Sequence, residues 1–199
     1  MKQRSTALSC AFGVTLLAMG VLAPAGCESR IERAAAPSNP TSLCISNMMA
    51  VWLLLRDWQG EGNSYPADLS FIANRTNRSL FLCPTTGHRP GDPSDVSKWT
   101  DFMYVSQSQT EPRIAMLLSP PEDHGGRFGI VVWESGYWDS VSPSQFRALV
   151  ETPWCMEYSP SSPAVKILKQ EMTVHVPERF SRTYPDAYAA PRRETPTSR

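Results

Sequence analysis

The sequence has no surplus of charge of either sign, because 19 Lys and Arg residues balance 19 Asp and Glu residues. A protein that binds nucleic acid through bulk charge needs a basic surplus to neutralise phosphates, so we expect no nucleic-acid partner. Helical-bundle proteins are excluded by a different feature, since 18 prolines among 199 residues would interrupt long helices too often. The length fits one domain with appendages.

Motifs that mark common enzymes and metal sites are also missing. The chain has no G-x-S-x-G nucleophile motif and no C-x-x-C pair, and its three histidines are far apart: His88, His124 and His175. We therefore expect a non-enzymatic protein with no metal, no cofactor and no small-molecule substrate, and a zinc site is the less favoured fate of its cysteines. Three acids in and beside a polar loop fit no defined calcium motif, so calcium stays a minor alternative: Asp92, Asp95 and Asp101.

The segment with the most chemical character is Glu122-Asp123-His124-Gly125-Gly126. Neighbouring residues of an extended chain point in opposite directions, so these side chains rarely converge on one ion. Pro120-Pro121 before the segment and the two glycines after it indicate a tight connection in which His124 hydrogen-bonds to the backbone. We interpret His124, Gly125 and Gly126 as a structural loop, with metal binding and acid–base catalysis as alternatives.

Residues 1–26 are typical of an export signal. Lys2 and Arg4 give it a charged start, and an apolar run from Ala7 to Ala23 follows. No acidic residue occurs before Glu28. The sequence therefore predicts an exported protein, and an uncut membrane anchor is the alternative, for which an apolar run of 17 residues is marginally long.

Two cleavage sites compete at the end of this signal. Ala25-Gly26-Cys27 is similar to the end of a bacterial lipobox, although Pro24 stands where a leucine is usual. Lipid attachment at Cys27 would hold the protein in the cell envelope, on the periplasmic or outer-membrane side. Cleavage after Ala23-Pro24-Ala25 would give a freely secreted protein instead. Residues 27–40 form the predicted tether, since they contain few large apolar side chains.

Three further cysteines belong to the exported part of the chain: Cys44, Cys83 and Cys155. An oxidising compartment permits disulfides. We favour a Cys44–Cys83 bridge because each residue flanks an apolar element, and closing that loop would stabilise the fold by about 3–4 kcal/mol in the chain-entropy model. The alternative is that all three remain buried thiols.

Residues 41–151 predict an α+β domain in which a long N-terminal helix packs on a small antiparallel sheet. The helix is expected from Ser42 to Gln59, where apolar residues recur on one face: Cys44, Met48, Val51, Leu55 and Trp58. Four strand-like runs follow with short links: Phe102–Val105, Ile114–Leu118, Phe128–Trp133 and Tyr137–Val141. Ser142 and Gln145 have capping-box spacing and begin a second helix that reaches about Val150.

The remainder of the chain has a different composition. Residues 152–176 form a C-terminal extension with a possible edge strand in Ala164–Val176, where apolar and polar residues partly alternate. Residues 177–199 contain four prolines and five arginines, and we expect a disordered tail.

The order of these pieces, from Cys44 to Val150, resembles the globular domain of pilin-like proteins in the type II secretion pseudopilin G superfamily, in the form found in planctomycete and verrucomicrobial envelopes. The blocks that carry the resemblance are CISNMMAVWLLLRDWQGEGNSYPADLS, FLCP and PEDHGGRFGIVVWESGYWDSVSPSQFRALV. The chain departs from the family at its start, because the prepilin methylation site and its membrane helix are absent. It departs again where Glu134-Ser135-Gly136 replaces the usual A-D-G hairpin.

The resemblance implies a pilin-like domain that a lipid holds at the membrane, with a scaffold or subunit role in secretion or surface assembly. Its implied partners are the membrane and pilin-like or secretion-system subunits. A secreted glycan-binding module that uses exposed tryptophans is the alternative from a different class, because the chain has six Trp.

Overall fold

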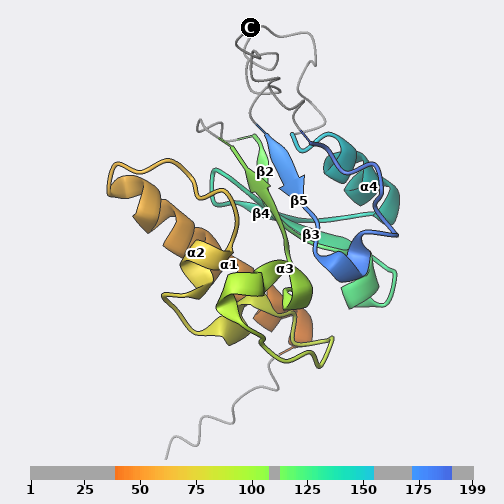
Figure 1. Ribbon diagram of the computed structural model, residues 1–199. Coiled ribbons are helices and arrows are strands. Elements are labelled where there is room, and N and C mark those ends of the chain that lie inside the picture. Colours follow the sequence, from red (N-terminus) through yellow and green to blue (C-terminus); the bar gives the residue numbers. More distant parts are fainter. Residues whose placement is uncertain (1–38, 108–112, 155–171, 190–199) are drawn as a thin grey trace, which may run out of the picture. The chain divides into compact units, whose positions relative to one another are not determined.

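The computed structural model describes residues 39–107, 113–154 and 172–189, all within one compact unit that spans residues 37–199. It combines helices with a five-stranded antiparallel sheet in the order β4-β3-β2-β1-β5 (Figure 1). The strands are β1 Met103–Ser106, β2 Ala115–Ser119, β3 Gly129–Trp133, β4 Trp138–Val141 and β5 Thr173–His175. The predicted α+β class is confirmed, and the first four strands agree with the prediction to within one residue at each end.

Helix α1 spans Pro40–Gly60. Its start differs from the prediction, because the Asn39 side chain caps it by accepting a hydrogen bond from Thr41 N at 3.1 Å, with Pro40 in the first helical position. Four of the five predicted inward-facing residues are buried: Cys44, Met48, Val51 and Leu55. Trp58 is only half-buried.

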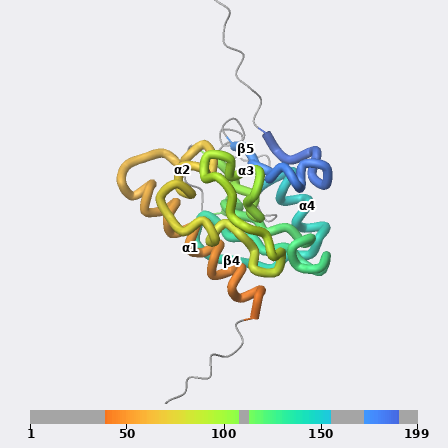
Figure 2. The backbone as a smooth tube through the Cα atoms, turned by 60° about the horizontal axis from the view of Figure 1, so that its bottom comes forward, coloured from red at the N-terminus to blue at the C-terminus, as the bar shows by residue number. Residues whose placement is uncertain are grey.

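The sheet is covered on both faces. Tyr104 of β1 joins the hydrophobic cluster under α1, whereas its neighbours Met103 and Val105 join the cluster on the other side. That second cluster includes Phe146 and Leu149 of α4. Figures 1 and 2 show α1 and α4 on opposite sides of the strands. The result is a three-layer arrangement.

Helix α4 spans Pro143–Glu151 and starts as the sequence predicts. The Ser142 hydroxyl accepts a hydrogen bond from Gln145 N, and the Gln145 side chain accepts one from Ser142 N at 3.0 Å, which makes a complete capping box. The remaining helices are short: α2 Ser70–Ala73, η1 Arg78–Phe81, η2 Pro93–Asp95, α3 Val96–Trp99, η3 Pro121–His124 and η4 Glu178–Phe180. No helix among the described residues has the length and hydropathy needed to cross a bilayer.

The C-terminal segment departs from the expectation of a disordered tail. Residues 177–189 are ordered, and Phe180 and Tyr184 lie in the cluster on the α4 side of the sheet. Two backbone hydrogen bonds attach Tyr188 to the rest of the fold. Its N–H donates to Val150 O in α4, and its carbonyl oxygen accepts from Val174 N in β5. Among the described residues, β5 lies at the edge of the sheet beside β1, and its residues fall within Ala164–Val176, where the sequence indicates a possible edge strand. Residues 164–171 and 190–199, also part of these predictions, lie outside the described residues.

Candidate functional site: a buried Cys–Cys–His cluster

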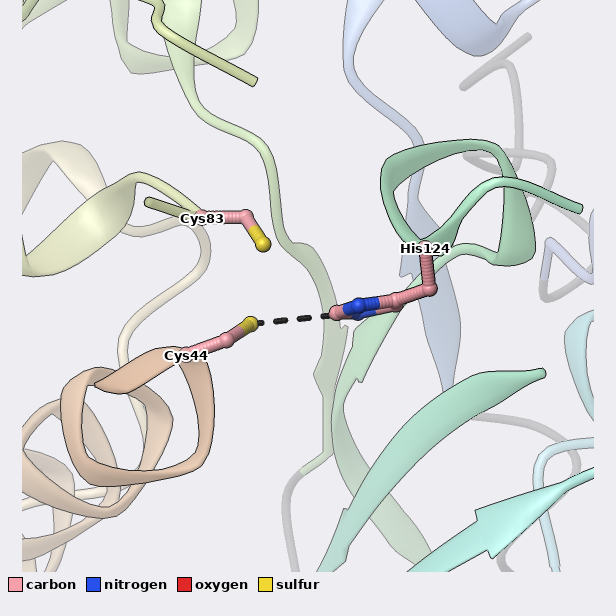
Figure 3. Close-up of side chains that lie close together, drawn as sticks. All are labelled: Cys44, Cys83 and His124. Carbon is pink, nitrogen blue, oxygen red and sulfur yellow. Dashed lines mark hydrogen bonds between the residues drawn. The ribbon is translucent and has the colours of Figure 1, made fainter. Parts of the chain in front are cut away.

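Three separate segments bring two cysteines and a histidine together on the α1 side of the sheet. Cys44 lies near the start of α1, Cys83 follows η1, and His124 ends η3. Their ligand atoms all lie within 4.8 Å of one another. In Figure 3 the two cysteine side chains lie on one side and His124 lies on the other, with its imidazole ring pointing toward them. The wide spacing of the histidines in the sequence, which made a zinc site the less favoured interpretation, does not keep His124 away from the cysteines, because sequence separation says nothing about which segments the fold packs together.

The imidazole of His124 is held between a strand, a helix and an aromatic ring. Its Nε2 lies 3.0 Å from Ser119 Oγ, at the end of β2, and 3.9 Å from Cys44 Sγ (Figure 3). The ring stacks on Phe128 with a centroid distance of 5.0 Å and an interplanar angle of 14°. Its Nδ1 is buried and has no hydrogen-bond partner among the described residues. Burial lowers the pKa of His124, and the charge of Arg127 lowers it further, so the neutral imidazole is favoured.

The loop that carries Cys83 is fixed by hydrogen bonds on both sides. Cys83 N donates to the Asp101 carboxylate at 2.8 Å, and Cys83 Sγ lies 2.9 Å from the Thr85 hydroxyl. That hydroxyl donates to the backbone carbonyl of Asp123 at 2.5 Å, beside His124. The Cys83 loop and η3 are thus linked directly at the cluster.

The two thiols differ in their tendency to ionise. Hydrogen bonding with Cys44 lowers the pKa of Cys83 against the opposing effect of burial, and Thr85 lowers it further. The same interaction with Cys83 raises the pKa of Cys44, and burial raises it as well. A thiolate therefore forms first on Cys83, while Cys44 keeps its proton.

The structure holds Cys44 and Cys83 as free thiols, so the expected disulfide between them is not formed there. The fold nevertheless places the two cysteines side by side, as the expected pairing requires. Cys27, the predicted lipid attachment site, and Cys155 lie outside the described residues.

Gly125 and Gly126 form the tight turn that the sequence predicts after η3. Both adopt a left-handed backbone, with φ of 67° and 74°, and Gly126 N donates to Pro121 O at 2.8 Å. His124 differs from the expectation in one respect, because its Nε2 faces the Ser119 side chain and not the backbone. The three consecutive polar side chains before the glycines point to separate partners: Glu122 to the Tyr184 hydroxyl, Asp123 to Arg179, and His124 to Ser119 and Cys44.

Asp101 organises a second polar cluster beside the first. Its carboxylate is fully buried and accepts from Thr86 Oγ1 at 2.6 Å, contacts His88 Nδ1 at 3.0 Å and forms an ion pair with Arg179. Burial raises the pKa of the neighbouring Asp123 to about 8, and the charge of Arg179 opposes that shift. The sequence did not predict this network, since its cation comes from the C-terminal segment.

The calcium alternative finds no support in the positions of its three acids. Asp92 caps η2 by accepting a hydrogen bond from Ser94 N at 2.9 Å, and Asp95 pairs with Lys98 at 2.7 Å. The Asp101 carboxylate accepts from Thr86 Oγ1 and pairs with Arg179. Each carboxylate thus has its own protein partners, and the three do not converge on one point.

Glu134, in the β3–β4 hairpin, attaches that hairpin to α1. Its buried carboxylate accepts a hydrogen bond from the Tyr65 hydroxyl at 3.0 Å and forms an ion pair with Arg56. Its backbone carbonyl accepts from Trp52 Nε1 at 3.1 Å. Glu134 is therefore a structural carboxylate that the sequence pattern did not predict.

The exposed aromatic residues bear on the glycan-binding alternative. Trp138 is the one exposed tryptophan among the described residues, at 47%, and Tyr137 beside it is 77% exposed. Tyr137 directly precedes Trp138, the first residue of β4, and neighbouring residues of an extended chain point in opposite directions, so we do not expect these two rings to share one flat platform. The other five tryptophans are half-buried or buried.

No protein-family model, curated protein or solved structure matches this chain.

Proposed function

We propose that the chain is a non-enzymatic lipoprotein of the bacterial cell envelope, in which a pilin-like domain serves as a scaffold or subunit of a secretion or surface assembly. The export segment 1–26 and the lipobox-like ending at Cys27 support the anchor. The packing of α1 supports the pilin-like domain and is the observation that carries the proposal. Its buried residues form one continuous core with Tyr104 of β1, Met116 of β2 and Ile130 of β3.

The exposed edge of the sheet supports the proposed subunit role. Strand β4 ends the sheet on one side, and the side chains at its first three positions are exposed. An exposed strand edge with aromatic side chains is typical of a surface that another protein covers. Tyr137 and Trp138 stand at the start of this edge, and both side chains are exposed.

Site-specific photo-crosslinking in cells that make the full chain tests this role. A photoreactive residue at Tyr137 should give adducts with other envelope proteins. The same residue at Ser97, an exposed position in α3, serves as the matched control and should give few. Equal yields at both positions, or no adducts at Tyr137, would contradict the proposal. Binding to isolated peptidoglycan that disappears in Trp138→Ala would favour the glycan-binding alternative.

A further inference from the structure

We propose that Cys44, Cys83 and His124 bind a zinc ion that ties α1, the Cys83 loop and η3 together. The observation behind this is the convergence of two thiols and one imidazole, from three segments, in a buried space. The three residues are 0%, 1% and 4% exposed. Thiolate and imidazole are the ligands that zinc prefers in proteins.

The distances suit a tetrahedral zinc ion after a small contraction. Zinc–sulfur bonds of about 2.3 Å and zinc–nitrogen bonds of about 2.0–2.1 Å place sulfur and nitrogen ligands about 3.5 Å apart, and two sulfurs about 3.8 Å apart. Cys44 Sγ and His124 Nε2 are 3.9 Å apart, and no pair of ligand atoms exceeds 4.8 Å. Small side-chain rotations therefore bring all three atoms to bonding distance.

The charge balance also suits the interior. On binding, each cysteine thiol releases its proton to solvent, and the two thiolates neutralise the dication. The imidazole binds in its neutral form through Nε2, which already faces Cys44. A site with no net charge avoids the cost of burying an isolated ion.

The surroundings of the cluster are those of a supported metal site. The Ser119 hydroxyl lies 3.6 Å from Cys44 Sγ and 3.0 Å from His124 Nε2, so the fourth coordination position would face this oxygen. The Thr85 hydroxyl lies 2.9 Å from Cys83 Sγ, and it can turn its proton from Asp123 O to the sulfur once Cys83 is a thiolate.

The full chain, purified under the redox conditions of its own compartment and without chelators, provides the test. We expect about one zinc per chain by elemental analysis. After removal of the zinc, titration with Co²⁺ should produce the visible bands of a tetrahedral site together with a near-ultraviolet thiolate-to-cobalt band. His124→Gln and Cys83→Ser should each lower metal retention at least tenfold. His175→Gln is the matched control, because this half-buried histidine lies outside the cluster, and it should retain zinc as the wild type does.

Several outcomes would overturn the proposal. A Cys44–Cys83 disulfide in peptide maps of the unreduced protein would do so, because it consumes both thiolates. If the reduced wild-type chain contains no zinc and gives no cobalt spectrum, the proposal is wrong. This result needs no variant, so the test holds even if a variant fails to fold. Zinc retained in full by both His124→Gln and Cys83→Ser would exclude this set of ligands.

Discussion

The side chain of Arg179, in the C-terminal segment, pairs with the fully buried carboxylate of Asp101. The same guanidinium lies 3.3 Å from Asp123, one residue before the histidine of the cluster. A cation from a segment far along the chain thus pairs with the buried carboxylate of Asp101 and lies beside a second acid, Asp123, next to the Cys–Cys–His site. The ordered C-terminal segment is therefore part of what stabilises the site.

Replacing Arg179 should destabilise the protein strongly. Arg179→Gln leaves the Asp101 carboxylate buried without its guanidinium partner, and breaking a buried pair by removing one member costs about 3–5 kcal/mol. Because the Arg179 side chain is 22% exposed, we expect a somewhat smaller loss, about 2–4 kcal/mol, in the free energy of unfolding from urea titration. Arg182→Gln, at an exposed position nearby, should change stability by less than about 0.5 kcal/mol. Equal effects of the two variants would show that the ion pair has no special role.

Gly136 should not tolerate a side chain. Its φ is 85°, and a Cβ there would lie 2.7 Å from the Trp52 ring. Gly136→Ala should therefore destabilise the protein by about 1–3 kcal/mol, through backbone strain and steric overlap with the tryptophan. Gly60→Ala is the matched control, since Gly60 ends α1, has no positive φ and would place its new Cβ more than 4 Å from any neighbouring atom. It should leave stability unchanged or raise it by up to about 1 kcal/mol. Thermal unfolding of both variants checks this.

His175 should make stability depend on pH. Burial lowers its pKa below the ordinary value of 6.5, against the opposing charge of Asp68. As the pH falls, His175 therefore binds a proton in the unfolded chain at a higher pH than in the folded chain. The free energy of unfolding is highest above about pH 6.5 and falls below it, until the pH passes the folded-state pKa. His124 acts in the same direction. Chemical denaturation at about pH 7.5 and about pH 5.5 should show a smaller difference for His175→Gln than for the wild type; an identical difference would contradict this prediction.

The sequence predicted the elements whose signals are local. The apolar stripe from Cys44 to Leu55 follows the helical period, and the Ser142 capping box has a fixed spacing, so neither depends on distant residues. The strands were also predictable, since short apolar runs with turn residues between them mark an antiparallel sheet.

The candidate site was not predictable in the same way. Its three residues lie on α1, after η1 and at the end of η3, and only the packing of these segments places them together. The order of the C-terminal segment differs from the prediction because prolines and arginines dominate its average composition, whereas its order depends on single side chains. Phe180 packs in the hydrophobic cluster on the α4 side of the sheet, and Arg179 forms an ion pair with Asp101. Composition averages cannot detect such individual contacts.

The last prediction concerns Cys27 and decides whether the protein is anchored or free. Lipid attachment requires the mature chain to begin at that thiol, and acyl chains contribute roughly 0.8 kcal/mol for each buried methylene, enough to hold the domain at a membrane durably. The wild type should therefore fractionate with membranes, incorporate a labelled fatty acid and show a lipid-modified N-terminus by mass spectrometry. Cys27→Ser should lose the label, and the chain should either appear in the soluble fraction after cleavage at Ala25 or remain unprocessed. Cys155→Ser, which leaves the signal segment intact, should stay lipidated and membrane-bound. An unmodified wild-type chain that begins at Gly26 would replace the anchored protein with a freely secreted one.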